Sequence, residues 1–146
     1  MRDVIISIHS IHGYGSEEQD CIDFTTDGTY SYDGFVGRLS YLESEVTGLP
    51  GTKTSMEISQ SGVSVDRKGF VTSHMVFREG GRDVFQYRTP YGMANMDMNT
   101  HRIKHSFNEN GGSVEIDYVL DLEHAIVLNN RFQMKVEPRE GERTKG

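Results

Sequence analysis

The sequence predicts an all-β protein that folds as a closed up-and-down barrel of about 8–10 antiparallel strands. Apolar and polar residues alternate along most of the chain, as in half-buried strands, and helical periodicity is nearly absent. Glycine-containing turn signals separate the alternating segments at short intervals. A long twisted sheet without crossover helices tends to close and so to remove its exposed edges. A β-sandwich is the alternative architecture.

The turn signals set the boundaries of the expected strands. They are Asp33-Gly34, Gly80-Gly81, Asn110-Gly111 and the glycines at positions 62 and 69. The expected strands cover residues 3–11, 19–26, 29–33, 36–46, 52–59, 62–68, 70–78, 83–89, 93–106, 113–122 and 125–137.

Alternation in the first and last strands assigns their inner faces. In the segment VIISIHSI, Val4, Ile6 and Ile8 share one face. The inner faces of the last two strands are Val114, Ile116, Tyr118, Leu120 and Leu122, then Ile126, Leu128, Asn130, Phe132, Met134 and Val136.

The segment YLESEVTG poses a question about charge inside the barrel. On a strand, Leu39, Tyr41, Glu43 and Glu45 lie on one face. If that face is the inner one, two carboxylates are buried and need cationic or hydroxyl partners. If it is the outer one, the carboxylates are solvated but Leu39 and Tyr41 are exposed. The alternation leaves both orientations open.

Arg67 is the expected partner of an inward Glu43. In GVSVDRKG, Val63 and Val65 define the inner face, and Arg67 continues it. An arginine at the end of an inner face can pair with a buried carboxylate or grip an acidic ligand. The alternative is that both charged groups are surface residues near strand ends.

Further residues are expected on the inner faces of their strands and could line a ligand site. Methionines adapt their shape to apolar ligands, although they more often fill gaps in a core. The set that we expect to contact a ligand is Tyr41, Glu43, Arg67, Phe77, Tyr87, Thr89, Met96, Met98, Thr100 and Tyr118.

Composition restricts the classes of partner and the compartment. The 146 residues fit one domain, expected at 1–138 with a flexible polar tail at 139–146. The net charge of −7 and the scattered lysines and arginines argue against nucleic acid and membranes as partners, while a small molecule and a homodimer stay open. One cysteine and no long apolar run predict a soluble, cytoplasmic protein.

Known catalytic and metal-binding motifs are not expected here. His101 and His105 would lie about 13 Å apart on a strand, too far for one metal ion. No nucleophile elbow and no phosphate-binding loop occurs, so we expect no cofactor. Glu43 and Glu45 have the spacing of a glycosidase pair, but such pairs usually come from different strands.

The ordered motifs of the chain resemble the YwiB-like family of uncharacterised bacterial proteins. The matching segments run from about residue 3 to 137. They are TTDGTYSY, LSYLESE, GTKTSMEIS, GVSVDRKG, MVFREG, YRTPYG, the Thr100 region, GGSVEIDY and NNRFQMKVE. The resemblance implies a closed calycin-type barrel, similar in architecture to lipocalins and fatty-acid-binding proteins, with no established activity.

The same resemblance also marks positions. Those that match the recurrent pattern of the family are Tyr41, Glu43, Thr54, Arg67, Gly69, Phe77, Tyr87, Thr89, Gly92, Thr100 and Tyr118, with Glu45 a weaker match. The chain has no tryptophan, so the glycine–x–tryptophan signature of lipocalins is missing. Lipid transport would therefore rest on fold analogy alone.

Three functions remain after this comparison. The first is a protein that binds a small polar-headed or carboxylate ligand inside the barrel, with Arg67 at the head group. The second is a filled barrel with a structural or protein-interaction role, in which Glu43 and Arg67 form a buried ion pair. The third is an enzyme that uses Glu43 as a general base.

Overall fold

The structure is a computed structural model that describes residues 1–13, 19–47, 49–122 and 126–139, with the side chains of 122–128 left out of that description. The expected tail lies, after Arg139, outside the described residues. Within the described ranges, no helix has the length and apolar character needed to cross a membrane.

The described residues form ten antiparallel strands and one short 3-10 turn, which confirms the predicted fold class. The elements are β1 (Arg2–His12), β2 (Asp20–Tyr32), β3 (Gly37–Leu42), η1 (Glu45–Thr47), β4 (Thr52–Ser59), β5 (Gly62–Gly69), β6 (Ser73–Phe77), β7 (Arg82–Thr89), β8 (Gly92–Asn108), β9 (Gly111–Leu122) and β10 (Ile126–Pro138).

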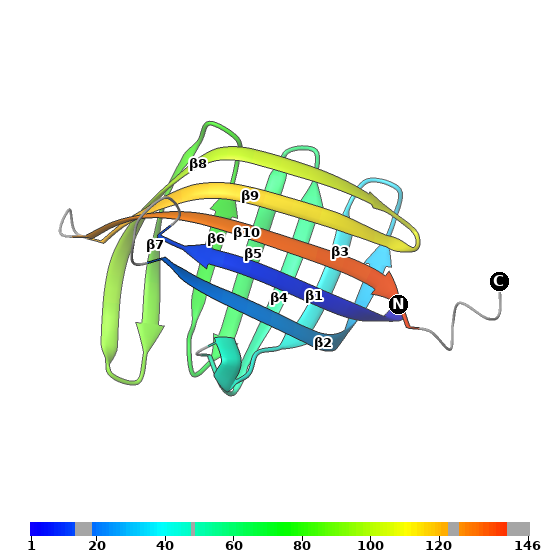
Figure 1. The fold of residues 1–146 in the computed structure, drawn as a ribbon, viewed down its shortest axis with the longest axis horizontal. Coiled ribbons are helices and arrows are strands. Elements are labelled where there is room, and N and C mark those ends of the chain that lie inside the picture. Colours follow the sequence, from blue (N-terminus) through cyan, green and yellow to red (C-terminus); the bar gives the residue numbers. More distant parts are fainter. Residues whose placement is uncertain (14–18, 48, 123–125, 140–146) are drawn as a thin grey trace.

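The strands form one sheet in which the two ends of the chain lie side by side. The sheet order is β6-β5-β4-β3-β2-β1-β10-β9-β8-β7, so β1 pairs with β10 and every other pair is consecutive in sequence. Figure 1 shows the long strands β1, β2, β8, β9 and β10 as one curved wall, with β3 to β6 crossing behind it. The edges of the sheet are therefore β6 and β7.

The seam between β6 and β7 is only partly joined, so the barrel is nearly closed. The backbones of Thr72 and Arg88 exchange two hydrogen bonds of 2.9 and 3.0 Å. Farther along the seam, the Asp83 carboxylate accepts a hydrogen bond from the Val76 amide at 3.1 Å, where a strand backbone would otherwise pair.

One expected strand boundary is wrong. The segments 19–26 and 29–33 form the single strand β2, because Gly28 lies inside the strand and makes no turn. A Cβ at this position would lie 2.6 Å from the Ser40 carbonyl oxygen and 2.5 Å from Ile6 Cδ1. The absence of a Cβ at Gly28 thus allows the neighbouring strands to approach closely.

The expected strand 36–46 also ends early. It stops at Leu42, and Ser44 organises the turn that follows: its carbonyl oxygen accepts from Thr47 and Leu49, both at 3.2 Å, and its hydroxyl accepts from Val46 at 3.1 Å. Such local bonds compete with a strand ladder. Glu45 consequently begins η1 and is exposed, so the expectation that it shares the inner face with Glu43 is wrong.

The inside of the barrel changes from apolar to polar along the strands. On β1, Val4, Ile6 and Ile8 are buried in the core, and the next inward position is Ser10. At the apolar end, the Tyr30 hydroxyl donates to the Asn108 carbonyl oxygen at 2.7 Å, and burial raises the pKa of Tyr30 to about 12. One end is therefore a packed core, and polar groups gather at the other.

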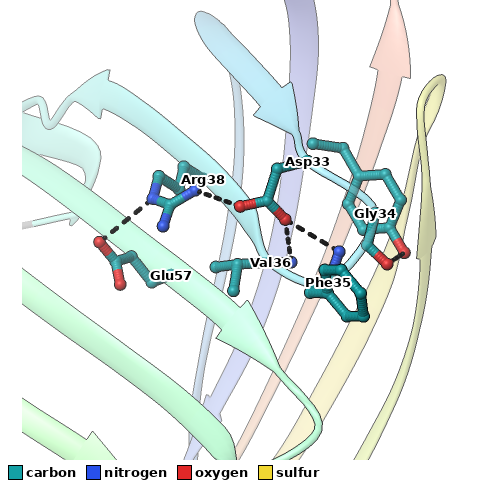
Figure 2. Close-up of polar contacts among 7 residues, drawn as sticks. Asp33, Gly34, Phe35, Val36, Arg38 and Glu57 are labelled. Atoms are coloured by element: carbon teal, nitrogen blue, oxygen red, sulfur yellow. Dashed lines mark hydrogen bonds and ion pairs between the residues drawn. The ribbon is translucent and has the colours of Figure 1, made fainter.

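The hairpin between β2 and β3 is held by a carboxylate. Figure 2 shows that the Asp33 carboxylate accepts from the amides of Val36 at 2.8 Å and Phe35 at 2.9 Å, and from Arg38 at 3.1 Å. Arg38 also faces Glu57 on β4, with 3.4 Å between Nε and Oε1. The two amide bonds, more than Arg38, lower the pKa of Asp33 from 3.8 to about 2.

This geometry predicts how Asp33 titrates. Because the folded pKa is lowered, ionised Asp33 stabilises the fold above its ordinary pKa of 3.8, and that contribution is lost as pH falls through about 2. We expect a carbon-detected NMR titration to show the Asp33 midpoint near 2. Arg38→Gln should leave most of the shift in place. A return to the ordinary value in Arg38→Gln would show that the ion pair, not the amides, sets the pKa.

Candidate functional site

The site is built around a buried carboxylate at the polar end of the barrel. Glu43 follows β3, and its amide donates to the Thr52 carbonyl oxygen at 2.8 Å, which keeps the residue in line with the strand. Its side chain is 2% exposed. The Thr54 hydroxyl donates to Glu43 Oε2 at 2.7 Å, so one carboxylate oxygen already has a partner.

Arg67 faces this carboxylate from β5. It lies opposite Thr54 in the β4–β5 register, and its Nε is 3.6 Å from Glu43 Oε2. That distance joins an ion pair but is too long for a hydrogen bond. Nη1 contacts the Met75 sulfur at 3.5 Å, and Nε makes no hydrogen bond to any described residue. The guanidinium is thus paired in charge and under-satisfied in hydrogen bonding.

Three tyrosines surround this ion pair. Burial raises the pKa of Tyr41, which the Glu43 carboxylate raises further and Arg67 opposes. Burial also raises the pKa of Tyr87 on β7 and of Tyr118 on β9, in each case against the effect of Arg67. Their hydroxyls therefore stay protonated at neutral pH and can donate hydrogen bonds.

A cavity of about 280 Å³ opens beside these groups. Its apolar wall includes Met75, Phe85, Leu120 and Phe132. Of the expected ligand-contacting residues, the structure brings together Tyr41, Glu43, Arg67, Tyr87, Met96 and Tyr118 on this wall. Contact between them and a ligand remains a prediction.

Four expected site residues lie elsewhere. Phe77 lines a separate void of about 40 Å³ deeper in the barrel, which Arg67 also borders. Met98 and Thr100 point inward but are buried away from the cavity wall. Thr89 belongs to the β7–β8 turn, where its hydroxyl accepts from the Tyr91 amide at 3.1 Å. Alternation identifies the face of a strand but not the level at which the cavity begins.

The sequence reasoning missed polar groups on β1 and β10. Ser10 and His12 line the cavity, His12 Nδ1 lies 3.0 Å from Asn130 Oδ1, and Ser10 and Asn130 are buried. The signal was present, because Ser10 and His12 continue the inner face of β1 and Asn130 interrupts an apolar one. Among the described residues, no group of three or more histidine, cysteine or acidic side chains could hold a metal ion.

Comparisons with known proteins agree with this architecture. The family described as "Domain of unknown function (DUF1934)" matches residues 6–134. A Bacillus subtilis (strain 168) protein described as "Uncharacterized beta-barrel protein YwiB" is 29% identical over 100 residues, which are 68% of this chain and 69% of that protein. The crystal structure of the ywiB protein from Bacillus subtilis matches with a TM-score of 0.82 at 23% identity, over 94% of this chain and 92% of that one. At this identity, the structural likeness shows a shared fold.

Proposed function

The chain belongs to the DUF1934 family, as its resemblance to YwiB-like proteins predicted, and from that premise we propose that it binds a small molecule with an acceptor-rich head group in the 280 Å³ cavity. The observation that carries this proposal is the Arg67 guanidinium, which borders the cavity with Nε free of any hydrogen bond to a described residue.

The balance of donors and acceptors favours an anionic or carbonyl-rich head group. Arg67 and the hydroxyls of Tyr87 and Tyr118 supply donors, whereas the Tyr41 hydroxyl is already engaged with Glu43 and Thr54. Glu43 is the carboxylate of the site, and it already accepts a hydrogen bond from Thr54. Buried donors without acceptors are costly, so a ligand that brings acceptor oxygens would satisfy them. A carboxylate is the simplest such group, because an arginine fork matches its geometry.

The remainder of the cavity suits a short apolar body. A volume of 280 Å³ corresponds to about nine water molecules, which is small for a ligand site. Met75, Met96, Phe85 and Phe132 supply the methionine and aromatic part of the wall. A closed meander that is open at one end is also how calycin-type barrels hold ligands, and we take this as analogy that supports the proposal.

The alternatives fit these contacts less well. For a general base, Glu43 offers at most one of its two carboxylate oxygens, Oε1, because Oε2 is engaged by both Thr54 and Arg67. A filled barrel would leave no space beside the ion pair. For the place of action, the exposed and unpaired Cys21 supports a reducing compartment such as the cytoplasm.

Binding of hexanoate, measured by calorimetry, tests the proposal. We expect wild type to bind hexanoate and not hexanol, because only hexanoate can accept charge-assisted bonds from Arg67. Glu43→Gln should bind hexanoate more tightly, since it removes a competing negative charge while it keeps an acceptor for Thr54. Glu43→Gln/Arg67→Met should bind about 10- to 150-fold more weakly than Glu43→Gln, the equivalent of 1.5–3 kcal/mol.

Glu43→Gln leaves Arg67 without its counter-charge but keeps the Thr54 acceptor, and the double variant removes both charges, so circular dichroism of each variant checks that the barrel is folded before the affinities are compared. Equal hexanoate affinity in the two variants would place the head group away from Arg67 and contradict the proposal. Weaker binding by Glu43→Gln than by wild type would instead show that Glu43 itself contacts the ligand.

A further inference from the structure

Two buried polar side-chain atoms lack a hydrogen-bond partner among the described residues, and they lie on neighbouring positions. They are Arg67 Nε and Ser73 Oγ. Arg67 on β5 and Ser73 on β6 are directly opposite in the antiparallel register, where side chains on one face stand about 5 Å apart. Since buried polar atoms rarely stay unpaired, two adjacent ones point to a shared partner that the chain itself does not provide.

Ser73 is buried and lies on the inner face of β6. The residue is 6% exposed and starts the inward set Ser73, Met75 and Phe77 on β6. Thr52 and Thr54 on the same inner wall each have a partner, namely the Val71 amide and the Glu43 carboxylate. Ser73 thus differs from the neighbouring buried hydroxyls.

The open seam gives access to this pair from outside. A hollow of about 400 Å³ lies along the β6–β7 seam, and its lining includes the inward residues Arg67, Ser73 and Phe85 together with outward residues of both strands. Phe85 and Arg67 also line the 280 Å³ cavity. Arg67 and Phe85 therefore border both the hollow and the cavity.

Three cations, Arg67, Lys68 and Arg88, line the seam hollow together with two carboxylates, Asp66 and Asp83, in a chain whose net charge is −7. Lys68 and Arg88 line it and make no ion pair with the part of the chain that the structure describes. Its two acids are engaged: Asp66 Oδ1 lies 2.5 Å from His74 Nδ1, and Asp83 accepts from the Val76 amide. An anion that approached this seam would meet Lys68 and Arg88 without competing ion-pair partners, while Arg67 is shared with Glu43.

We infer that the seam hollow binds an oxyanion, a carboxylate or a phosphate, with one oxygen between Arg67 Nε and Ser73 Oγ. Both atoms are closed to solvent in the structure, so the Arg67 side chain, which is 20% exposed, must shift to admit that oxygen, which then accepts from both donors. Lys68 and Arg88 attract the anion to the seam but do not reach the buried oxygen. This inference deepens the proposed function, on which it rests: it names the head group as an oxyanion, and makes Ser73 a residue that selects it.

NMR titration with inorganic phosphate and with acetate tests the inference without an apolar chain. We expect each anion to shift the Arg67 Nε resonance saturably, and Ser73→Ala to weaken this binding about tenfold or more. Ser64→Ala is the matched control, because Ser64 lies on the outer face of β5 and does not line the seam hollow. The tighter of the two anions identifies the head group as phosphoryl or carboxylate.

The charges are tested through salt dependence. Lys68→Gln/Arg88→Gln should lower anion affinity at low ionic strength and flatten its dependence on salt, because exposed charges act over a screened distance. Lys104→Gln, on the exposed face of β8, should leave both unchanged.

Two results would overturn the inference. They are equal anion affinity in wild type and Ser73→Ala, or no response of Arg67 Nε to either anion. Hexanoate separates this failure from that of the proposed function. If hexanoate binds wild type and Ser73→Ala equally, the result supports binding in the cavity and contradicts the seam site. If phosphate shifts Arg67 and hexanoate does not bind, the seam site stands alone.

Discussion

Glu43→Ala is expected to lower the free energy of unfolding by close to the roughly 3–5 kcal/mol that breaking a buried ion pair costs. The change leaves Arg67 without its counter-charge and Thr54 Oγ1 without its acceptor. The Arg67 side chain is 20% exposed, so water recovers part of the loss and the lower end of that range is the better figure. Urea denaturation followed by circular dichroism measures the change.

Glu45→Ala is the matched control. This variant also removes a glutamate carboxylate, two residues along the chain, but Glu45 is exposed at the start of η1. We therefore expect the free energy of unfolding to change by no more than about 0.5 kcal/mol. Glu43→Leu/Arg67→Met should recover much of the stability, since apolar replacement of a buried pair is often neutral or better. Equal effects of Glu43→Ala and Glu45→Ala would show that the ion pair contributes nothing to the fold.

Gly69→Ala is expected to cost roughly 2–5 kcal/mol of unfolding free energy, from strain and from overpacking. The residue has a φ of 133°, and a Cβ there would lie 2.2 Å from the Gly51 carbonyl oxygen and 3.0 Å from Thr52 Cα. Because these are backbone atoms, the strand must move. Thr52 accepts hydrogen bonds from the amides of Glu43 and Val71. Because a movement of Thr52 would displace Glu43, we also expect weaker hexanoate binding.

Gly34→Ala separates the two causes. Gly34 also has a positive φ, 97°, but no atom lies within 4 Å of the position that a Cβ would take. It should therefore cost only the conformational strain, about 1 kcal/mol, and leave hexanoate affinity unchanged. If Gly34→Ala proves as damaging as Gly69→Ala, close approach of β5 to Gly51 is not what requires glycine at position 69.

These expectations share a structural cause. The packed end of the barrel supplies stability, and the polar end leaves groups unsatisfied and a seam unpaired. A protein that binds a ligand at one end of a barrel needs such a division, because a cavity and unpaired donors reduce stability. A ligand that fills them should stabilise the fold in proportion to its affinity.

The sequence by itself was sufficient for the fold and for part of the site. Alternation with a period of two, together with the glycine turns, predicts the strands, and the inner face of β5 predicts that Arg67 points inward. The expected inner face of β1, formed by Val4, Ile6 and Ile8, is likewise the buried face observed. These features are local, because side-chain direction in a strand depends only on position along it.

Tertiary structure alone decided what happens between strands. Alternation could not show that Ser44 ends β3 and exposes Glu45, since the turn competes with pairing to β4. It could not bring Lys68 and Arg88 together at a seam, because Lys68 lies on β5, next to the edge strand β6, and Arg88 lies on β7 at the opposite edge of the sheet. Nor could it reveal that Ser73 lacks a partner. Each of these depends on which strands meet and how closely, and that is set by closure of the whole barrel.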